Sequence, residues 1–519
     1  MSALQRKKSL FRFFGRKRQS HSARLPADCL YDIFNLLKDD IKSLHSCILV
    51  NRLWCETAIP YLWSHPFKRS TPPAPSLINI LVACLSDNEK SVLIQNGIKI
   101  SSQLKKSPTF DYAAFIPNLG LESLYSSVQN WTMRQSVKRR SSISSQCVSE
   151  INNNALSVYY ALCRLFFGNN STITSLKLDR PTKLSSPVMD DNLGVDLSLQ
   201  NIKNLTIRYT SDQFLFDPLL KQAETIESLS VIKSSEAGLR NFEDLQYLSS
   251  LIFAQSKLRS FSLMCYDTVN GFSPSVLTPL ASQADTLVSL NLHGIPFPGD
   301  SSIHALTICT NLEELDIRRC TNGPGCQLDQ ILLADFPNLR KVKIVESSIL
   351  WGHLISSIIQ KNPIDLEEVH YHPWEDEEHD SLSISIIQSI TKYQPKLKKF
   401  GIALGADEVP SLIEIFNAPG CKLESLSLFS LGKQECDLDK IWPELGKHLP
   451  NTLKHLNIWI FIGARPMNLF LKNTKVDLDS LYIDSWFEDY SHPPYINVLC
   501  DYLKDRPIDM ANFFTPILN

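Results

Sequence analysis

Three histidines and a run of acidic residues lie close together in the second half of the chain, and metal ions bind to these residue types. His370 and His372 alternate along a predicted strand and share one face, while His379 follows within the acidic run 375–380. Zinc sites use such ligands. However, the turn predicted after His372 and the remaining acids are more typical of a surface loop. We therefore predict no metal site and no cofactor, and we interpret the acidic run as solvated or as a patch for a basic partner.

Signatures of enzyme catalysis are absent from the sequence. It contains no Gly-x-Ser-x-Gly motif, no glycine-rich phosphate loop and no His-Glu-x-x-His motif. Glycine is also scarce, with 18 in 519 residues, which disfavours a phosphate-cradling loop. No residue stands out as a candidate nucleophile. We therefore expect a protein that binds other proteins and catalyses no reaction itself.

A six-residue motif, apolar-x-x-apolar-x-apolar, predicts the elements that position the polar side chains. It begins at Ile173, Ile202, Ile226, Leu258, Leu287, Leu312, Leu339, Leu366, Leu397, Leu423, Leu453 and Leu478. Period-2 alternation at the end of each motif predicts a short strand, and apolar stripes between motifs predict helices. A strand and a helix at this period form a leucine-rich repeat, so we predict a curved α/β solenoid of parallel strands over residues 155–497. Residues 498–519 are expected to cap its end.

Motif positions 3, 5 and 7 alternate with the apolar positions, so they should share the concave face of the solenoid. These positions are mainly serine in the early repeats, charged in the middle repeats and aromatic near the end. Exposed aromatic and charged groups on a rigid surface favour protein binding. We predict that a protein substrate binds across Glu314, Asp316, Arg318, Lys341, Lys343, Glu368, His370, Lys399, Phe429 and Trp459. The alternative is a solvated face whose charges balance between neighbouring strands.

Residues 24–67 contain three short helical patterns. Leu25-Pro26 opens an apolar stripe that ends at Leu37, and polar residues from Asp39 onward offer N-caps for a second helix. A third pattern follows, with a break expected before Pro60. A unit of this size has a thin core, so it usually depends on a partner or on the next domain.

The ordered set Leu-Pro, Leu-x-x-Ile-Phe, Val-x-x-x-Trp and Leu-Trp in this stretch resembles an F-box. The resemblance covers residues 25–67 and implies docking to a Skp-type adaptor, which bridges to a cullin ubiquitin ligase. It implies that the adaptor contacts Leu25, Pro26, Leu30, Ile33, Phe34, Leu44, Val50, Trp54, Leu62 and Trp63. The alternative is an ordinary three-helix unit that packs only within this chain.

An F-box followed by leucine-rich repeats implies a substrate-recognition subunit of an SCF-type ubiquitin ligase. Such a subunit raises the effective concentration of a substrate near the ligase without doing chemistry itself. The competing hypothesis is a scaffold that binds partners without ubiquitylation. Residues 68–154 are expected to supply a Pro-rich hinge, a helical connector over 76–130 and a flexible Ser-rich loop over 132–150.

Charge is distributed unevenly along the chain. The first 24 residues carry eight basic side chains and no acid, so the net charge of −2 leaves −10 for residues 25–519. We interpret residues 1–23 as a disordered basic tail, with nuclear import or attachment to anionic membranes as alternatives. The acidic body disfavours nucleic acid as the main ligand.

The lengths of the apolar runs and the pattern of cysteines indicate the cellular compartment of the protein. No apolar run reaches the roughly 18–20 residues of a membrane helix. The 13 scattered cysteines form no Cys-x-x-Cys pair, which favours a reducing compartment. We therefore expect a cytoplasmic or nuclear protein without a transmembrane segment.

Overall fold

The chain divides into two compact units, Met1–Pro117 and Asn118–Asn519. The computed structural model describes residues 25–67, 75–137, 145–168, 171–178, 199–208, 216–233, 242–266, 274–297, 300–322, 329–362, 365–373, 380–405, 408–430, 441–460, 462–483, 498 and 501–502. The predicted basic tail, most of the Pro-rich hinge and most of the predicted C-terminal cap lie outside these residues.

Three short helices open the first unit, as the sequence predicts: α2 (Ala27–Leu36), α3 (Ile41–Cys47) and α4 (Arg52–Leu62). Side-chain caps begin two of them. The Asp40 side chain accepts a hydrogen bond from the Ser43 amide at 3.0 Å, and the Asn51 side chain accepts one from the Trp54 amide at 3.0 Å. These acceptors satisfy amide groups that have no partner within the helix.

The predicted break before Pro60 is wrong, because α4 continues through this residue to Leu62. Proline removes one backbone hydrogen bond, and near the end of a helix that loss is small. Tertiary contacts compensate for it. Ala58 and Ile59 are buried, and the Tyr61 hydroxyl donates a hydrogen bond to the Tyr31 carbonyl of α2 at 3.1 Å. The last turn of α4 is thereby fastened to α2.

Helices form in the first part of the predicted connector over 76–130, and these are α5 (Pro75–Cys84), α6 (Asp87–Gln95) and the short η1 (Ala113–Phe115). The predicted range from residue 118 onward belongs to the second unit. Ser86 and Glu89 form a capping box at the start of α6. Trp63, just after α4, contacts Tyr112 in a tilted arrangement with ring centroids 4.4 Å apart, so the three-helix group is packed against the end of this unit.

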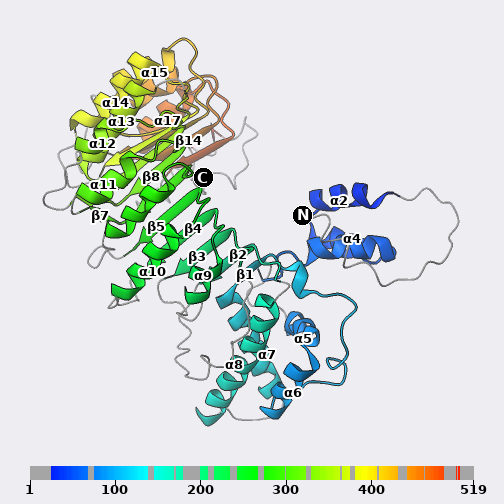
Figure 1. Cartoon of the computed structure of the whole chain (residues 1–519). Helices are drawn as coiled ribbons and strands as arrows, with labels where there is room; N and C mark the ends of the chain where they lie inside the picture. The colour runs from blue at the N-terminus through cyan, green and yellow to red at the C-terminus, as the bar shows by residue number, and fades with distance from the viewer. Residues whose placement is uncertain are drawn as a thin grey trace. The chain divides into compact units, whose positions relative to one another are not determined.

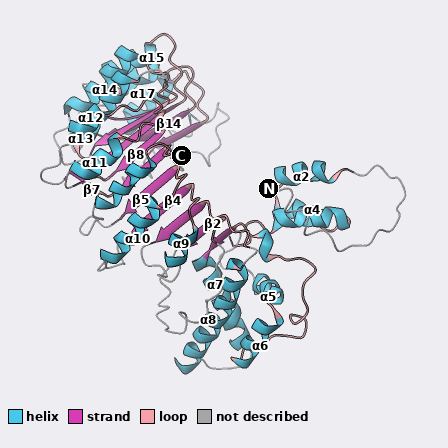
Figure 2. Cartoon of the chain, viewed as in Figure 1, coloured by secondary structure: helices cyan, strands magenta, loops and turns pink. Residues whose placement is uncertain are grey.

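A sheet of 13 parallel strands forms the second unit, and each strand pairs with its predecessor and successor (Figures 1 and 2). The strands are β1 (Asn118–Gly120), β2 (Ser175–Leu178), β3 (Asn204–Arg208), β4 (Ser228–Lys233), β5 (Ser260–Cys265), β6 (Ser289–His293), β8 (Glu314–Arg318), β10 (Lys341–Ser347), β11 (Glu368–Pro373), β12 (Lys399–Leu404), β13 (Ser425–Ser430), β14 (His455–Trp459) and β15 (Ser480–Ile483). All twelve predicted motifs form strands. Two short strands, β7 (Pro296–Phe297) and β9 (Thr321–Asn322), pair separately.

Helices follow most strands and pack side by side on one face of this sheet (Figure 2). They are α9 (Phe216–Gln222), α10 (Phe242–Phe253), η3 (Pro274–Gln283), α11 (Asp300–Thr307), α12 (Asp329–Leu333), α13 (Ile349–Lys361), α14 (Asp380–Tyr393), α15 (Val409–Asn417), α16 (Trp442–His448) and α17 (Ala464–Asn473). The apolar motif residues point toward these helices and are buried. The intervening residues point to the opposite side, which we call the strand face.

The sheet begins earlier than the predicted boundary at residue 155. Its first strand, β1, pairs with β2, and is followed by α7 (Leu121–Val137) and α8 (Ser145–Phe167), which pack together. The predicted boundary therefore falls inside α8. Most of the predicted Ser-rich loop is helical too, since α7 extends to Val137 and α8 begins at Ser145. Serine and threonine can bond back to the helix, as Thr132 does to the Val128 carbonyl at 3.1 Å.

Charged residues line the edge of the sheet where the strands begin. They occupy motif position 2 and alternate in sign on either side of Val288: Lys203, Glu227, Arg259, Val288, Glu313, Arg340, Glu367, Lys398, Glu424, Lys454 and Asp479. Glu367 pairs with both of its neighbours, Arg340 and Lys398. We call this row the edge charge row, and its alternation favours the observed order of neighbouring repeats.

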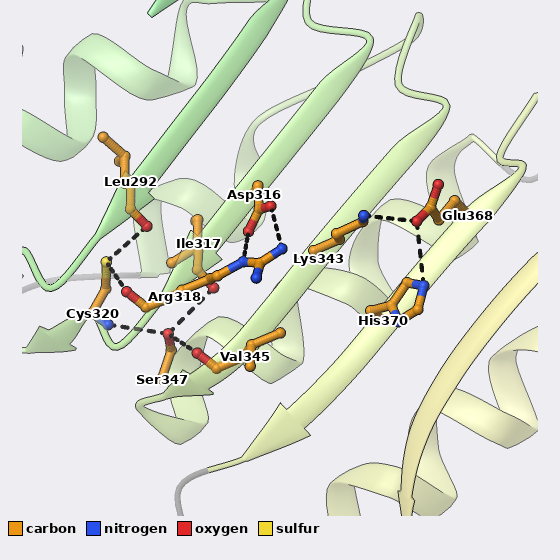
Figure 3. Close-up of polar contacts among 10 residues, drawn as sticks. All are labelled: Leu292, Asp316, Ile317, Arg318, Cys320, Lys343, Val345, Ser347, Glu368 and His370. Atoms are coloured by element: carbon orange, nitrogen blue, oxygen red, sulfur yellow. Dashed lines mark hydrogen bonds and ion pairs between the residues drawn. The ribbon is translucent and has the colours of Figure 1, made fainter. Parts of the chain in front are cut away.

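Polar groups also link repeats at the opposite ends of the strands. Cys320 follows the end of β8, and its thiol contacts the Arg318 carbonyl at 3.3 Å (Figure 3). Ser347 of the next repeat accepts a hydrogen bond from the Cys320 amide at 3.1 Å. Burial raises the pKa of the Cys320 thiol to about 12, so this residue acts as a small, uncharged core group.

Candidate functional site

All ten residues predicted to bind substrate lie on the strand face. Parallel pairing places Glu314, Lys341, Glu368 and Lys399 in one row across four strands. The register matches the motif prediction, because buried and less buried residues alternate along β8 and β10. The strand face therefore brings together side chains that are about 27 residues apart in sequence.

Most of the predicted charges are paired with each other. The Arg318 guanidinium donates two hydrogen bonds to the Asp316 carboxylate, at 2.7 and 2.9 Å, and Lys341 forms an ion pair with Glu314. Both pairs are partly exposed. This arrangement matches the alternative in which charges balance between neighbouring strands, so these four residues are less available to a partner than the sequence suggested.

Lys343, Glu368 and His370 form a buried ionic cluster at the centre of the strand face (Figure 3). Glu368 Oε1 lies 2.9 Å from Lys343 Nζ and 3.3 Å from His370 Nε2, and the Glu368 side chain is only 5% exposed. Burial alone would raise the pKa of this carboxyl, but His370 and Lys343 outweigh it and lower the pKa to about 2. Burial also lowers the pKa of His370, despite the nearby carboxylate. The cluster is therefore a structural element of the sheet.

Small residues in β12 make room for larger neighbours. A Cβ atom on Gly401 would overlap the His370 ring, so only glycine fits beneath it. Ala403, two residues later, is fully buried. The His372 ring in β11 stacks with Phe429 in β13, and their centroids are 4.6 Å apart. Because β12 lies between these strands, the stack passes over its small side chains.

The stack continues toward the end of the sheet. Phe429 stacks with Trp459 at a centroid distance of 6.1 Å, and Trp459 contacts Tyr482 at 4.8 Å. We call His372, Phe429, Trp459 and Tyr482 the aromatic column. The predicted binding set includes its two middle members but not His372 or Tyr482. The sequence did contain a signal for the full column. Gly401 and Ala403 in β12 are small and leave space for rings from the strands on both sides.

In the first unit, the structure separates the ten predicted adaptor contacts into three groups. Leu25, Pro26, Ile33 and Val50 are exposed, whereas Trp54, Leu62 and Trp63 are partly buried. Leu30, Phe34 and Leu44 have no exposed surface and form the core of the three helices with Ala58. As folded, these three cannot touch a partner, so their place in the predicted contact is corrected. They match the motif because they build the unit.

Other apolar residues of the three-helix group are exposed although the motif did not point to them. They are Leu36, Ile41, Leu49 and Leu53, with exposed fractions of 85, 39, 73 and 36%. Leu49 also borders a groove of about 370 Å³ beside α4, together with Cys55 and Phe110. These side chains give the three-helix group an exposed apolar surface, and such surfaces are typical of interaction sites.

Among the described residues, no three side chains that could bind a metal ion come together. His370 contacts Glu368, and His372 stacks on Phe429. His379 and the acidic residues before it lie outside the described residues. None of the helices described in the structure is both long and apolar enough to cross a bilayer.

Comparison with protein-family models gave no match to this chain, and comparison with curated proteins gave none either. Candidate functions therefore rest on the motif in the first unit and on the geometry of the two surfaces.

Proposed function

We propose that this protein is the substrate-recognition subunit of an SCF-type ubiquitin ligase, with an F-box in the first unit and leucine-rich repeats in the second. The observation that carries the proposal is how the F-box-like motif is used in the three-helix group. Its buried members, such as Leu30 and Phe34, form the core, while Leu25, Pro26, Ile33 and Val50 remain exposed beside further apolar side chains. In this proposal the motif both folds the unit and leaves an exposed apolar surface for the adaptor.

The second unit supports the recognition half of the proposal. Stacked strand and helix repeats form a rigid, extended surface that suits protein binding. The strand face carries aromatic and charged side chains, and binding energy in protein interfaces concentrates in such anchors. In this arrangement the repeats hold a substrate while the F-box connects it to the ligase through a Skp-type adaptor.

Adaptor capture tests the proposal. Replacing Leu25→Ala together with Pro26→Ala should reduce capture of a Skp-type adaptor at least about tenfold, since it removes exposed apolar area from the contact. The full-length variant and the wild type are compared by pulldown with the purified adaptor. The melting temperature should stay unchanged because neither side chain belongs to the core.

The matched control is Phe253→Ala with Leu333→Ala, which removes two exposed apolar side chains from the second unit. This control should capture the adaptor normally. Undiminished capture by the stably folded Leu25/Pro26 variant would refute the F-box assignment. A second pulldown supplies a purified cullin together with the adaptor. Capture of the adaptor without the cullin in that pulldown would favour the non-ubiquitylating scaffold.

A further inference from the structure

The strand face is basic although the protein is acidic. Along the described strands it carries the basic residues Lys177, Arg208, Arg318, Lys341, Lys343 and Lys399 against the acidic residues Glu314, Asp316 and Glu368. Six positive and three negative charges leave a net charge of +3. Residues 25–519 carry −10 in total. The face is thus polarised against the rest of the molecule, and this polarity attracts anionic partners.

Part of the positive excess lies at Lys399. Its neighbour in the row is Glu368, which is already engaged by Lys343 and His370. On the other side the row continues with Ser425 and His455, which carry no negative charge. Lys399 is partly exposed, and no ion pair to it forms among the residues that the structure describes. It is therefore a cation that remains available on the strand face.

The aromatic column starts on the strands beside Lys399. Phe429 and Trp459 are partly exposed and offer apolar surface on strands β13 and β14. The indole Nε1 of Trp459 is buried and has no hydrogen-bond acceptor within the described part of the chain. A cation and an apolar surface thus lie within a few strands of each other.

From this combination we infer that the strand face over β12–β14 binds an acidic peptide segment of the substrate, with a carboxylate at Lys399 and an apolar side chain on Phe429 and Trp459. The inference rests on the proposed function, in which this face recognises the substrate. Charge sets the orientation and rate of association, whereas the rings supply the apolar anchor. Nucleic acid is disfavoured because the surrounding body is acidic.

Fluorescence anisotropy with the full-length protein tests the inference. The probe is a short fluorescein-labelled peptide with leucine at every third position and glutamate elsewhere. It should bind, and binding should weaken as salt is raised. Peptides in which lysine replaces glutamate, or glutamate replaces leucine, should bind at least about tenfold more weakly, because each lacks one of the two features. A single-stranded DNA oligonucleotide that binds as well as the acidic peptide would overturn the choice of peptide.

Two charge reversals locate the site. Lys399→Glu should weaken peptide binding at least about tenfold, whereas Lys396→Glu, in the exposed loop of the same repeat, should change it less than about twofold. Equal effects of the two variants, or no effect of Lys399→Glu, would overturn the inference. Both variants should capture the Skp-type adaptor normally. If the wild-type protein does not capture the adaptor, only the F-box proposal is refuted, because peptide binding is measured without the adaptor.

Discussion

Glu314 and Glu368 occupy the same row of the strand face but have different surroundings. Glu314 is 44% exposed and pairs with the exposed Lys341, whereas Glu368 is buried between Lys343 and His370. An exposed ion pair contributes little to stability, because water screens it and both side chains lose freedom. A buried carboxylate that loses its charge leaves its partners without compensation. Two identical residue types therefore have different roles.

Replacing Glu368→Gln should destabilise the second unit by about 3 kcal/mol, the value that follows from lowering a pKa of 4.5 to about 2. The matched control, Glu314→Gln, should cost less than about 1 kcal/mol. Urea unfolding followed by circular dichroism compares the two variants with the wild type. Similar losses from both would show that burial does not distinguish these carboxylates.

The same substitution predicts a pH dependence. Because the pKa of Glu368 is lower in the folded protein, its contribution is present above pH 4.5 and is lost as pH falls toward 2. The stability difference between wild type and Glu368→Gln should therefore narrow over that range. A difference that stays constant down to pH 2 would contradict the assigned pKa.

At the scale of single elements, the edge charge row aligns neighbouring repeats. Glu367 lies between Arg340 and Lys398 and pairs with both, and these contacts lower its pKa. The backbone carbonyls of this row from Lys203 to Lys454 also accept two amide hydrogen bonds each from the next repeat, as Arg340 does from Glu367 at 2.8 Å and Glu368 at 3.0 Å. Side chains and backbone thus select the same register.

Reversing one charge of this row should weaken the alignment. Glu367→Lys places three positive charges next to one another in the edge charge row. It should lower the melting temperature by no more than a few degrees, because these groups are solvated. The effect should shrink as salt is raised. Glu414→Lys, an equal charge change at an exposed position of α15, should leave the melting temperature nearly unchanged. Equal shifts for the two variants, independent of salt, would show that the row has no specific role.

The first strand, β1, has the same apolar motif as the later strands but lies outside their regular period. Ile116, Leu119 and Leu121 have the same apolar-x-x-apolar-x-apolar spacing as the twelve motifs, and all three are buried. The long insertion of α7 and α8 separates them from the next motif and hides the period. The spacing of the apolar residues identifies this strand, whereas the repeat period does not, because the insertion interrupts it.

At the scale of the whole molecule, the chain divides into two compact units, and domains of this kind can fold alone. A fragment spanning residues 118–519 should therefore unfold cooperatively, as measured by thermal circular dichroism. A fragment spanning 155–519 should not, because it lacks β1, α7 and the first half of α8. Cooperative unfolding of the shorter fragment would show that these elements are dispensable and would restore the boundary predicted from sequence.

The sequence alone determined the strands of the second unit and the direction of their side chains. An apolar residue at every second position can be buried only in one register, so the motif at Leu366 already places Glu368 and His370 on the strand face. It also determined the three helices of the first unit, through caps such as Asp40 and apolar spacing.

Only the tertiary structure decided which of those side chains are available. Neighbours on the strand face come from different repeats, so the sequence could not show that Glu368 is buried by Lys343 and His370 while Lys399 has no described ion-pair partner. The same holds in the first unit, where Phe34 is buried and Leu25 is exposed within one motif. Spacing along a chain determines the direction of a side chain, but burial depends on what packs against it from distant segments.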